Sequence, residues 1–216
     1  MFLPDVHVET DTAEVLQLIR ENPLGILITN IKSSQQDSLQ CTHVPFVLDL
    51  PDESGESAPQ GTLRDPKFYV ETKPDTAKVV PTWNYAATQI YGKLSLYYDS
   101  KTSETGAFLA KQLHDLSENS ERSIMGYTGG DSPEPWKVAD APERYIDIMQ
   151  RNIVGIEIRI NKIEGKFKMS QEKRGGDLEG VIKGFANLGS ETGDAISALV
   201  KERADLYELK KQEIKN

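Results

Sequence analysis

Alternation of apolar and polar side chains in two stretches is the feature that most constrains the fold of this chain. In residues 89–98, apolar side chains recur at every second position. In residues 153–169 they occupy even positions as far as Ile160 and odd positions from Ile163 onward. A period of two is typical of strands with one buried face. The change of face predicts two strands joined by a two-residue turn at 161–162, and hence a mostly antiparallel sheet or barrel.

Further elements are predicted from apolar runs, helical spacing and capping residues. Strands are expected over 24–31, 42–48 and 79–85, and helices after Asp11, over 103–117, after Asp140, and around 178–188 and 196–207. Asp11 and Asp140 each precede a glutamate by three positions, Glu14 and Glu143, which is the capping-box pattern. The continuously apolar 24–31 is predicted to be a buried strand.

The order of these elements predicts the α+β class, with a mostly antiparallel barrel or sheet, peripheral helices and a helical C-terminus. Asp, Glu, Ser, Gly and Pro dominate residues 51–66, which predicts an exposed loop. We therefore expect a sheet domain over 1–176 and a helical extension over 177–216 that packs on it.

Composition restricts the class of partner. Lys and Arg total 25 against 34 Asp and Glu, a formal net charge of −9, which disfavours broad binding to nucleic acid or anionic membranes. Cys41 is the single cysteine, so no intrachain disulfide is expected. No apolar stretch reaches the ~20 residues of a membrane span, so we expect no membrane partner. An intracellular protein is predicted, in the cytoplasm or alternatively the nucleus.

A basic stretch near the second alternating segment is the first candidate site. Lys166, Lys168 and Ser170 are expected on the strand face opposite Phe167, next to Gln171. Two ammonium groups and a hydroxyl suit a phosphate or another anion. The alternative interpretation is a solvated strand face.

Aromatic residues beside an amide form the second candidate. Trp83, Asn84 and Tyr85 could stack on a planar ring and hydrogen-bond its edge, or could simply pack in a core or interface. The three histidines are scattered, so no metal site is predicted, and no residue is identified as a catalytic acid, base or nucleophile.

Taken together, the segments resemble the PaiB-type family of FMN-binding negative transcriptional regulators. The resemblance rests on MFLP at 1–4, THVPF at 42–46, VVPTWNY at 79–85, PWKV at 135–138, DAP at 140–142, IVGIEI at 153–158, EGKFKMSQ at 164–171 and GVI at 180–182. It implies an FMN-binding split barrel that forms a homodimer, with FMN held between the subunits. It also implies cofactor-binding roles for Lys166, Lys168, Ser170, Gln171, Trp83, Asn84, Tyr85, Thr42 and His43.

The chain departs from the family pattern at two places. Glu172 and Lys173 stand where the pattern continues with Asn and Arg, and a carboxylate there would weaken phosphate binding unless it points away. Arg64 is followed almost directly by Pro66, where family members carry a helical box and a further barrel strand. One barrel segment is therefore expected to be missing, which would weaken FMN binding and leave an open sheet edge.

Three functions follow as hypotheses. The first is a flavin-binding regulator or sensor, the second a small FMN-dependent oxidoreductase, and the third a shortened member that has lost flavin binding. Direct DNA binding is not expected, because no helix-turn-helix with a basic recognition helix is evident.

Overall fold

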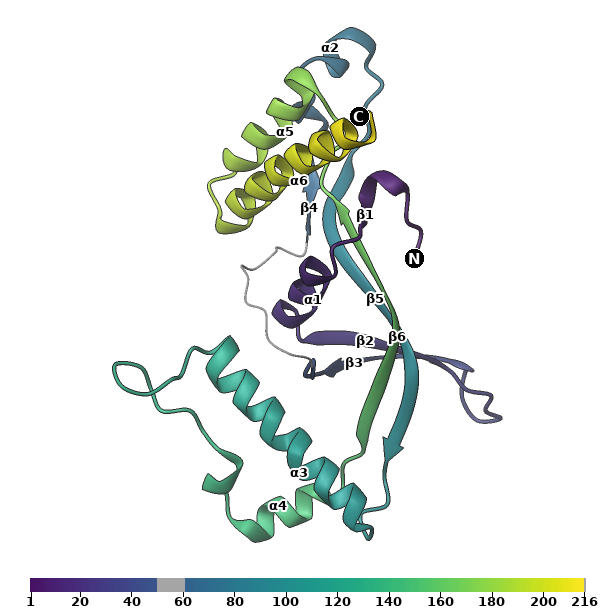
Figure 1. The fold of residues 1–216 in the computed structure, drawn as a ribbon, viewed down its shortest axis with the longest axis vertical. Coiled ribbons are helices and arrows are strands. Elements are labelled where there is room, and N and C mark those ends of the chain that lie inside the picture. The colour runs from purple at the N-terminus through teal and green to yellow at the C-terminus, as the bar shows by residue number, and fades with distance from the viewer. Residues whose placement is uncertain (50–60, 216) are drawn as a thin grey trace. The chain divides into compact units, whose positions relative to one another are not determined.

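The structure is a computed structural model that describes residues 1–49 and 61–215, and it divides into two compact units. Unit 1 joins Met1–Glu21, Lys162–Asn216 and the described part of Asp52–Ile90, and unit 2 joins Tyr91–Asn161 and the described part of Asn22–Pro51. Each unit is described separately below (Figure 1).

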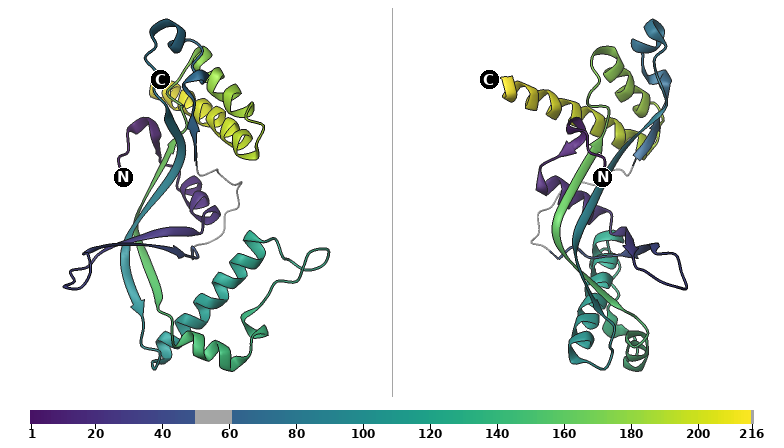
Figure 2. Two further views of the ribbon diagram at one scale, coloured as in Figure 1. Left: turned by 180° about the vertical axis from the view of Figure 1, so that it is seen from behind. Right: turned by 90° about the vertical axis from the view of Figure 1, so that its right-hand side faces the viewer.

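Antiparallel strands form the framework, as the alternation predicts. One sheet has the order β1 (Val8–Glu9), β6 (Gly155–Lys168), β5 (Thr82–Tyr97) and β4 (Gly61–Arg64). A second, two-stranded sheet pairs β2 (Leu24–Asn30) with β3 (Leu39–Pro45). Both β5 and β6 are long and run from one unit into the other (Figures 1 and 2). The α+β class is confirmed, and the described residues contain no closed barrel.

Unit 1 contains the main hydrophobic core. Helices α5 (Gly175–Ala186) and α6 (Glu191–Lys215) pack against the end of β6, with α1 (Thr12–Glu21) beside them. The buried members of this core are Leu18, Phe167, Met169, Val181, Phe185, Ile196, Leu199 and Val200. The short segments at Pro66–Phe68 and α2 (Thr72–Thr76) approach α5 closely, because Gly184 leaves room for the Phe68 ring. The ring of Phe68 meets Phe185 edge-on at 5.1 Å.

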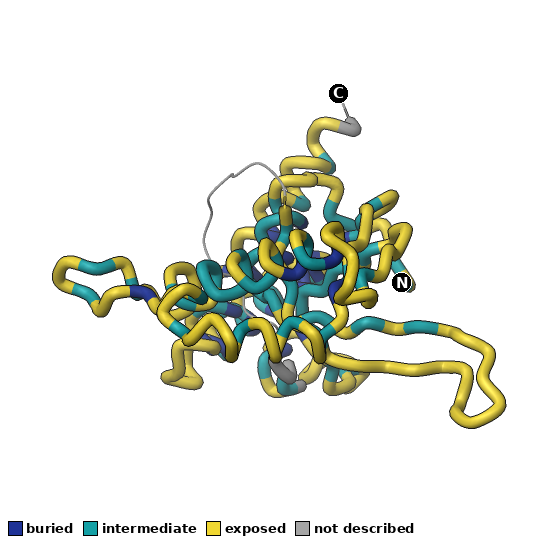
Figure 3. The backbone as a smooth tube through the Cα atoms, turned by 90° about the horizontal axis from the view of Figure 1, so that it is seen from below, coloured by how far each residue is buried: buried dark blue, intermediate teal, exposed yellow. Residues whose placement is uncertain are grey.

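Unit 2 buries much less apolar surface. It contains α3 (Ser103–Glu118), a π-helical turn at Asn119–Ile124, a short 3-10 turn at Val138–Asp140, α4 (Glu143–Gln150) and the β2–β3 sheet. Leu109 is its one buried large apolar side chain among the described residues. Figure 3 colours the backbone by burial, and most of it is intermediate or exposed. Tyr97 stacks on Phe108 with ring centroids 3.8 Å apart. Thr102 caps α3 by accepting a hydrogen bond from the Thr105 amide.

The predicted turn at 161–162 is wrong, since β6 passes through these residues without a break. The apolar positions change from even to odd because β6 leaves unit 2 at Asn161 and enters unit 1 at Lys162, where its other face becomes buried. The two strands expected over 79–85 and 89–98 are likewise one strand, β5, which runs through residues 86–88 without a break.

Two smaller predictions are also corrected, and a third is not tested. The strand over 24–31 exists as β2 but is not buried, because the second sheet has two strands within the described residues and leaves one face uncovered. Residues 51–60 of the expected loop lie outside the described residues, whereas Gly61–Arg64 is a strand because its backbone pairs with β5. The domain assignment 1–176 and 177–216 stays a prediction.

The two predicted capping boxes also differ from the structure. Asp11 does cap α1, accepting from the Ala13 amide, but the Asp11 amide donates to Glu9. Glu14 instead pairs with the Arg203 guanidinium at 2.7 Å, a charge-assisted partner that outcompetes a neutral amide. Asp140 caps the 3-10 turn that begins after Lys137, and α4 starts after Pro142.

Candidate functional site

The sheet of unit 1 has two different faces where β5 and β6 lie in it. Phe167 and Met169 point into the hydrophobic core, and Ala86 packs against the same core. Since side chains alternate along a strand, Asn84 shares the core face, while Tyr85 and Lys166 lie on the other. We call this opposite side the cationic face and define it by Trp83, Tyr85, Lys166 and Lys168. Cofactor binding by these four residues stays a prediction.

Lys166 is the most unusual residue of the cationic face. Its side chain is buried, with 6% of the residue exposed. The ammonium donates to the Phe2 carbonyl at 2.9 Å and lies 5.3 Å from the centroid of Tyr85 and 5.7 Å from that of Phe2. Among the described residues it forms no ion pair with a carboxylate. A buried charge without a counter-charge is costly, so an anion arriving here would be favoured.

Lys168 brings a second ammonium group to the same ring. Its Nζ donates to Thr82 Oγ1 at 2.5 Å and lies 5.9 Å from the centroid of Tyr85. Trp83, which the alternation of β5 places on the same face as Tyr85, is 56% exposed and offers a large aromatic surface. Cations together with aromatic surface suit a ligand that has both an anionic group and a planar ring.

Ser170 does not lie on the cationic face, and the prediction that it does is wrong. Strand β6 ends at Lys168, and Ser170 follows in the left-handed conformation with φ 65°, so the alternation no longer applies. Its hydroxyl is buried and donates to Asn84 Oδ1 at 2.9 Å. The Nδ2 of Asn84 is buried and has no hydrogen-bond partner among the described residues.

Gln171 holds the chain after β6 in place. Its Oε1 accepts from the Met169 amide at 2.7 Å, and its Nε2 donates to the carbonyls of Phe167 and Val6. These bonds occupy both ends of the amide. Binding of the cofactor by Asn84, Ser170 and Gln171 stays a prediction, and the contacts give these residues a supporting position behind the lysines.

Thr42 and His43 lie in β3 of unit 2 and are exposed there. They face opposite sides of the sheet, since Thr42 pairs with Leu27 and His43 with Ile26 in consecutive positions. Their approach to the same pocket as the lysines stays a prediction.

Glu172, which interrupts the family pattern, points toward other partners. Its carboxylate lies 3.7 Å from His7 Nε2 and 3.8 Å from Lys173 Nζ. The sequence analysis missed two participants, the Phe2 carbonyl and the Thr82 hydroxyl. Phe2 belongs to a segment that carries the family resemblance, but no pattern indicates that its backbone contacts Lys166.

Asp177 organises the segment around α2. Burial alone would raise the pKa of Asp177, but hydrogen bonds from the Thr72 hydroxyl and from the Glu71 and Thr72 amides outweigh it and hold the pKa below its usual value. In return, Glu71 Oε1 accepts from the Gly176 amide at 2.8 Å. These reciprocal bonds fix the start of α5.

The described residues offer neither a metal site nor a membrane-spanning helix. No group of three or more His, Cys, Asp or Glu side chains in 1–49 and 61–215 is placed to hold a metal ion. Within the same residues, no helix has the length and apolar character needed to cross a membrane.

Comparison with known families identifies the class of protein. The family described as "Putative FMN-binding domain" matches residues 1–65 and 64–162, so this chain belongs to that family. The predicted resemblance to the PaiB-type family is thereby confirmed. The two matched segments meet at Arg64 and Asp65, where the sequence analysis expected a missing segment. Lys166, Lys168, Ser170 and Gln171 lie beyond the matched residues.

Individual relatives extend the similarity over almost the whole chain. An uncharacterized protein of Aspergillus fumigatus is 46% identical over 261 residues, covering 97% of this chain and 100% of the relative. One of Emericella nidulans is 43% identical over 256 residues, with coverage of 97% and 100%. The "Protease synthase and sporulation protein PAI 2" of Bacillus subtilis is 24% identical over 230 residues, with coverage of 98% and 100%. These alignments are longer than the 216 residues of this chain, so parts of the relatives have no counterpart here.

Proposed function

We propose that this protein is a flavin-binding regulator or sensor that holds FMN on the cationic face. The observation that carries the proposal is the buried ammonium of Lys166, which lacks a carboxylate partner among the described residues and shares the Tyr85 ring with Lys168. Membership of an FMN-binding family supports the choice of ligand.

Different residues of the cationic face suit different parts of FMN. Lys166 and Lys168 hold the phosphate, and Trp83 and Tyr85 supply surface for the ring system. Asn84, Ser170 and Gln171 keep the end of β6 in position from the core side. Bound flavin would supply reversible electron transfer, which suits a redox sensor as well as an oxidoreductase.

A regulatory role is favoured over an enzymatic one by the site and by a relative. No acid, base or nucleophile stands on the cationic face apart from the two lysines and Tyr85. The name of the B. subtilis relative, "Protease synthase and sporulation protein PAI 2", includes sporulation, which is a cellular process. With a net charge of −9, regulation through a protein partner is more favourable than direct binding to DNA.

The working form is a homodimeric split barrel. In unit 2, Leu24, Ile26 and Ile28 of β2 are 62%, 56% and 65% exposed on one face of a two-stranded sheet. A two-stranded sheet is marginally stable in water by itself, and a large exposed apolar face is typical of an interface. A second copy of the chain is the proposed cover.

A second candidate is a shortened member of the family that has lost flavin binding, and the break in the family match favours it. The family match breaks at Arg64–Asp65, and β4, which ends at Arg64, is the outer strand of its sheet. A strand lost here would remove part of a barrel and the contacts it carries.

Titration of the purified protein with FMN distinguishes the candidates. The proposal expects yellow protein whose FMN is not bleached by NADH or NADPH. Bleaching would indicate the oxidoreductase, and colourless protein that ignores added FMN would indicate the shortened member. We expect Lys168→Ala to weaken FMN binding by about tenfold, as removal of one charge-assisted hydrogen bond does. Unchanged affinity would remove Lys168 from the site, and Lys93→Ala, an exposed lysine of unit 2, serves as the control.

A further inference from the structure

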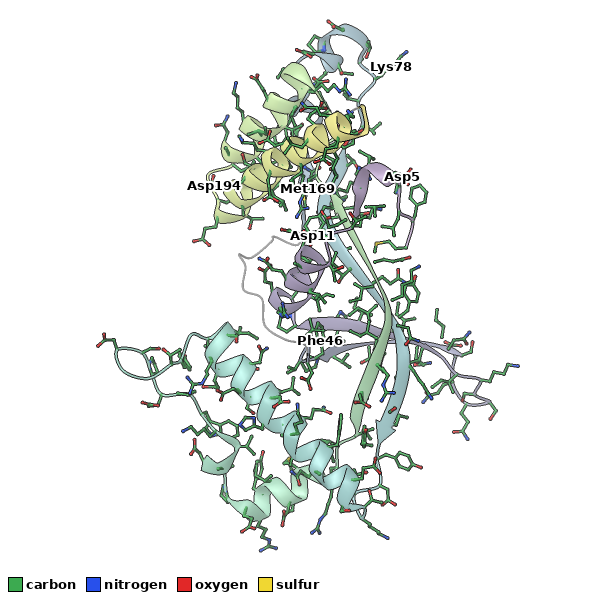
Figure 4. The ribbon with its side chains drawn as sticks, viewed as in Figure 1. Asp5, Asp11, Phe46, Lys78, Met169 and Asp194 are labelled. Atoms are coloured by element: carbon green, nitrogen blue, oxygen red, sulfur yellow. The ribbon has the colours of Figure 1, made fainter. Side chains whose placement is uncertain are left out.

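The N-terminal residues fold back onto the lysine that the proposed function uses. Val8 begins β1 and pairs with Lys166 in the sheet, and six residues earlier the Phe2 carbonyl accepts a hydrogen bond from Lys166 Nζ. Residues 2–5, which we call the N-terminal strap, thus leave the sheet beside Lys166 and return to its side chain. Asp5, labelled in Figure 4, lies in this strap.

The strap holds Lys166 by weak contacts. Phe2 is 82% exposed, so its ring gains little from burial and rests 5.7 Å from the ammonium. Within the segment, the His7 amide donates to the Pro4 carbonyl at 2.8 Å and the Val8 amide donates to the Asp5 carbonyl. The strap is anchored on both sides: the Val6 carbonyl accepts from Gln171 Nε2 at 2.9 Å, and the Met1 ammonium lies 3.3 Å from the Glu164 carboxylate.

We propose that the N-terminal strap is a built-in competitor, in which the Phe2 carbonyl occupies the place on Lys166 that an anionic oxygen of the ligand takes. A neutral carbonyl is a weaker partner for an ammonium than a phosphate oxygen. The ligand therefore displaces residues 2–5. They swing about Val6, which Gln171 holds, and the ion pair between the Met1 ammonium and Glu164 opens. The inference rests on the proposed function and adds regulation to it: a change that loosens the strap tightens binding, and a partner that clamps the strap prevents it.

Deletion of Phe2 and Leu3 tests the competition directly. FMN titrated against the full chain and the deletion variant should bind the variant about fivefold more tightly, equivalent to about 1 kcal/mol. Riboflavin, which has no phosphate, should bind both proteins equally. Phe2→Leu keeps the backbone carbonyl and should stay within about twofold of the unaltered protein.

Hydrogen exchange gives a second measurement, in which displacement of the strap and ordinary ligand binding change the exchange rate in opposite directions. Ligands usually protect the segments they touch, whereas displacement of the strap should accelerate exchange at the amides of His7 and Val8 when FMN is added. Equal FMN affinity of the full chain and the deletion variant, or slower exchange at these amides, would overturn the proposal that the strap competes with FMN. Either result would leave the proposal of flavin binding intact. Absence of FMN binding to both proteins would overturn the proposed function together with it.

Discussion

The two units of the molecule use the same long strands in different ways. In unit 1, β5 and β6 have one face against α5 and α6, and the core there includes Phe185 and Val200, both fully buried. In unit 2, β5 is exposed on both faces from Tyr91 to Leu96, and β2 presents an apolar face to solvent. Unit 1 therefore contains its own core, whereas unit 2 needs additional cover to bury its apolar side chains. The proposed ligand binding therefore belongs to unit 1, and the proposed assembly to unit 2.

The largest effect is expected in the core of unit 1. Phe185→Ala removes a fully buried ring that also meets Phe68, and should lower the free energy of unfolding by about 3–5 kcal/mol. The chain has two tryptophans, Trp83 in unit 1 and Trp136 in unit 2, so variants with one tryptophan report each unit separately during urea unfolding. Equal destabilisation seen by both tryptophans would show that the units unfold together and would break the comparison.

Matched Gly→Ala substitutions are expected to change the stability of the two units in opposite directions. In α5, a Cβ at Gly184 would lie 2.3 Å from the Phe68 ring, so Gly184→Ala should destabilise unit 1 by about 1–3 kcal/mol. In α3, nothing lies within 4 Å of a Cβ at Gly106, so Gly106→Ala should stabilise unit 2 by about 0.5–1 kcal/mol. Thermal unfolding of both variants measures the two signs. A neutral Gly184→Ala would mean that Phe68 does not pack on α5 in solution.

The sequence predicted the elements well where one face of a segment stays buried throughout. Helix α3 and the two C-terminal helices follow from their apolar spacing, because their contacts lie within one unit. The pattern of β6 could not be interpreted correctly, because its buried face changes at Asn161–Lys162 and a change of face resembles a hairpin turn.

The candidate site was predictable in part for similar reasons. The alternation of side chains correctly places Lys166 and Lys168 on the face opposite Phe167, because β6 continues as far as Lys168. Ser170 was misplaced because its left-handed φ of 65° cannot be recognised from a residue type that rarely adopts it. The Phe2 carbonyl could not be found at all, because a backbone acceptor leaves no trace in the pattern of side chains.

A substitution on the exposed face of β2 tests the proposed role of unit 2 in assembly. Ile26→Asp puts a charge on a side chain that is 56% exposed, so the isolated subunit should lose little stability. A proposed dimer that buries this face should dissociate at least about tenfold more readily, since a charge is costly in an apolar contact. Sedimentation over a range of protein concentrations measures this. Thr29→Asp, on the other face of β2, is the control. A monomer for all three proteins would contradict the assembly role of unit 2.

The smallest effect concerns Asp177, whose pKa is lowered by its hydrogen bonds in the folded unit 1. A carboxyl with a lowered folded pKa contributes stability above its unfolded pKa of about 3.9, and that contribution is lost as the pH falls through the folded value. Asp177→Asn should therefore cost about 1 kcal/mol near pH 7 and progressively less below about pH 4. Urea unfolding monitored by Trp83 against pH tests this, and Asp194→Asn, a carboxyl in the first turn of α6, is the matched control. A stability difference that does not depend on pH would show that the charge of Asp177 does not contribute to stability. A change in unfolding seen by Trp136 would show that the two units unfold together.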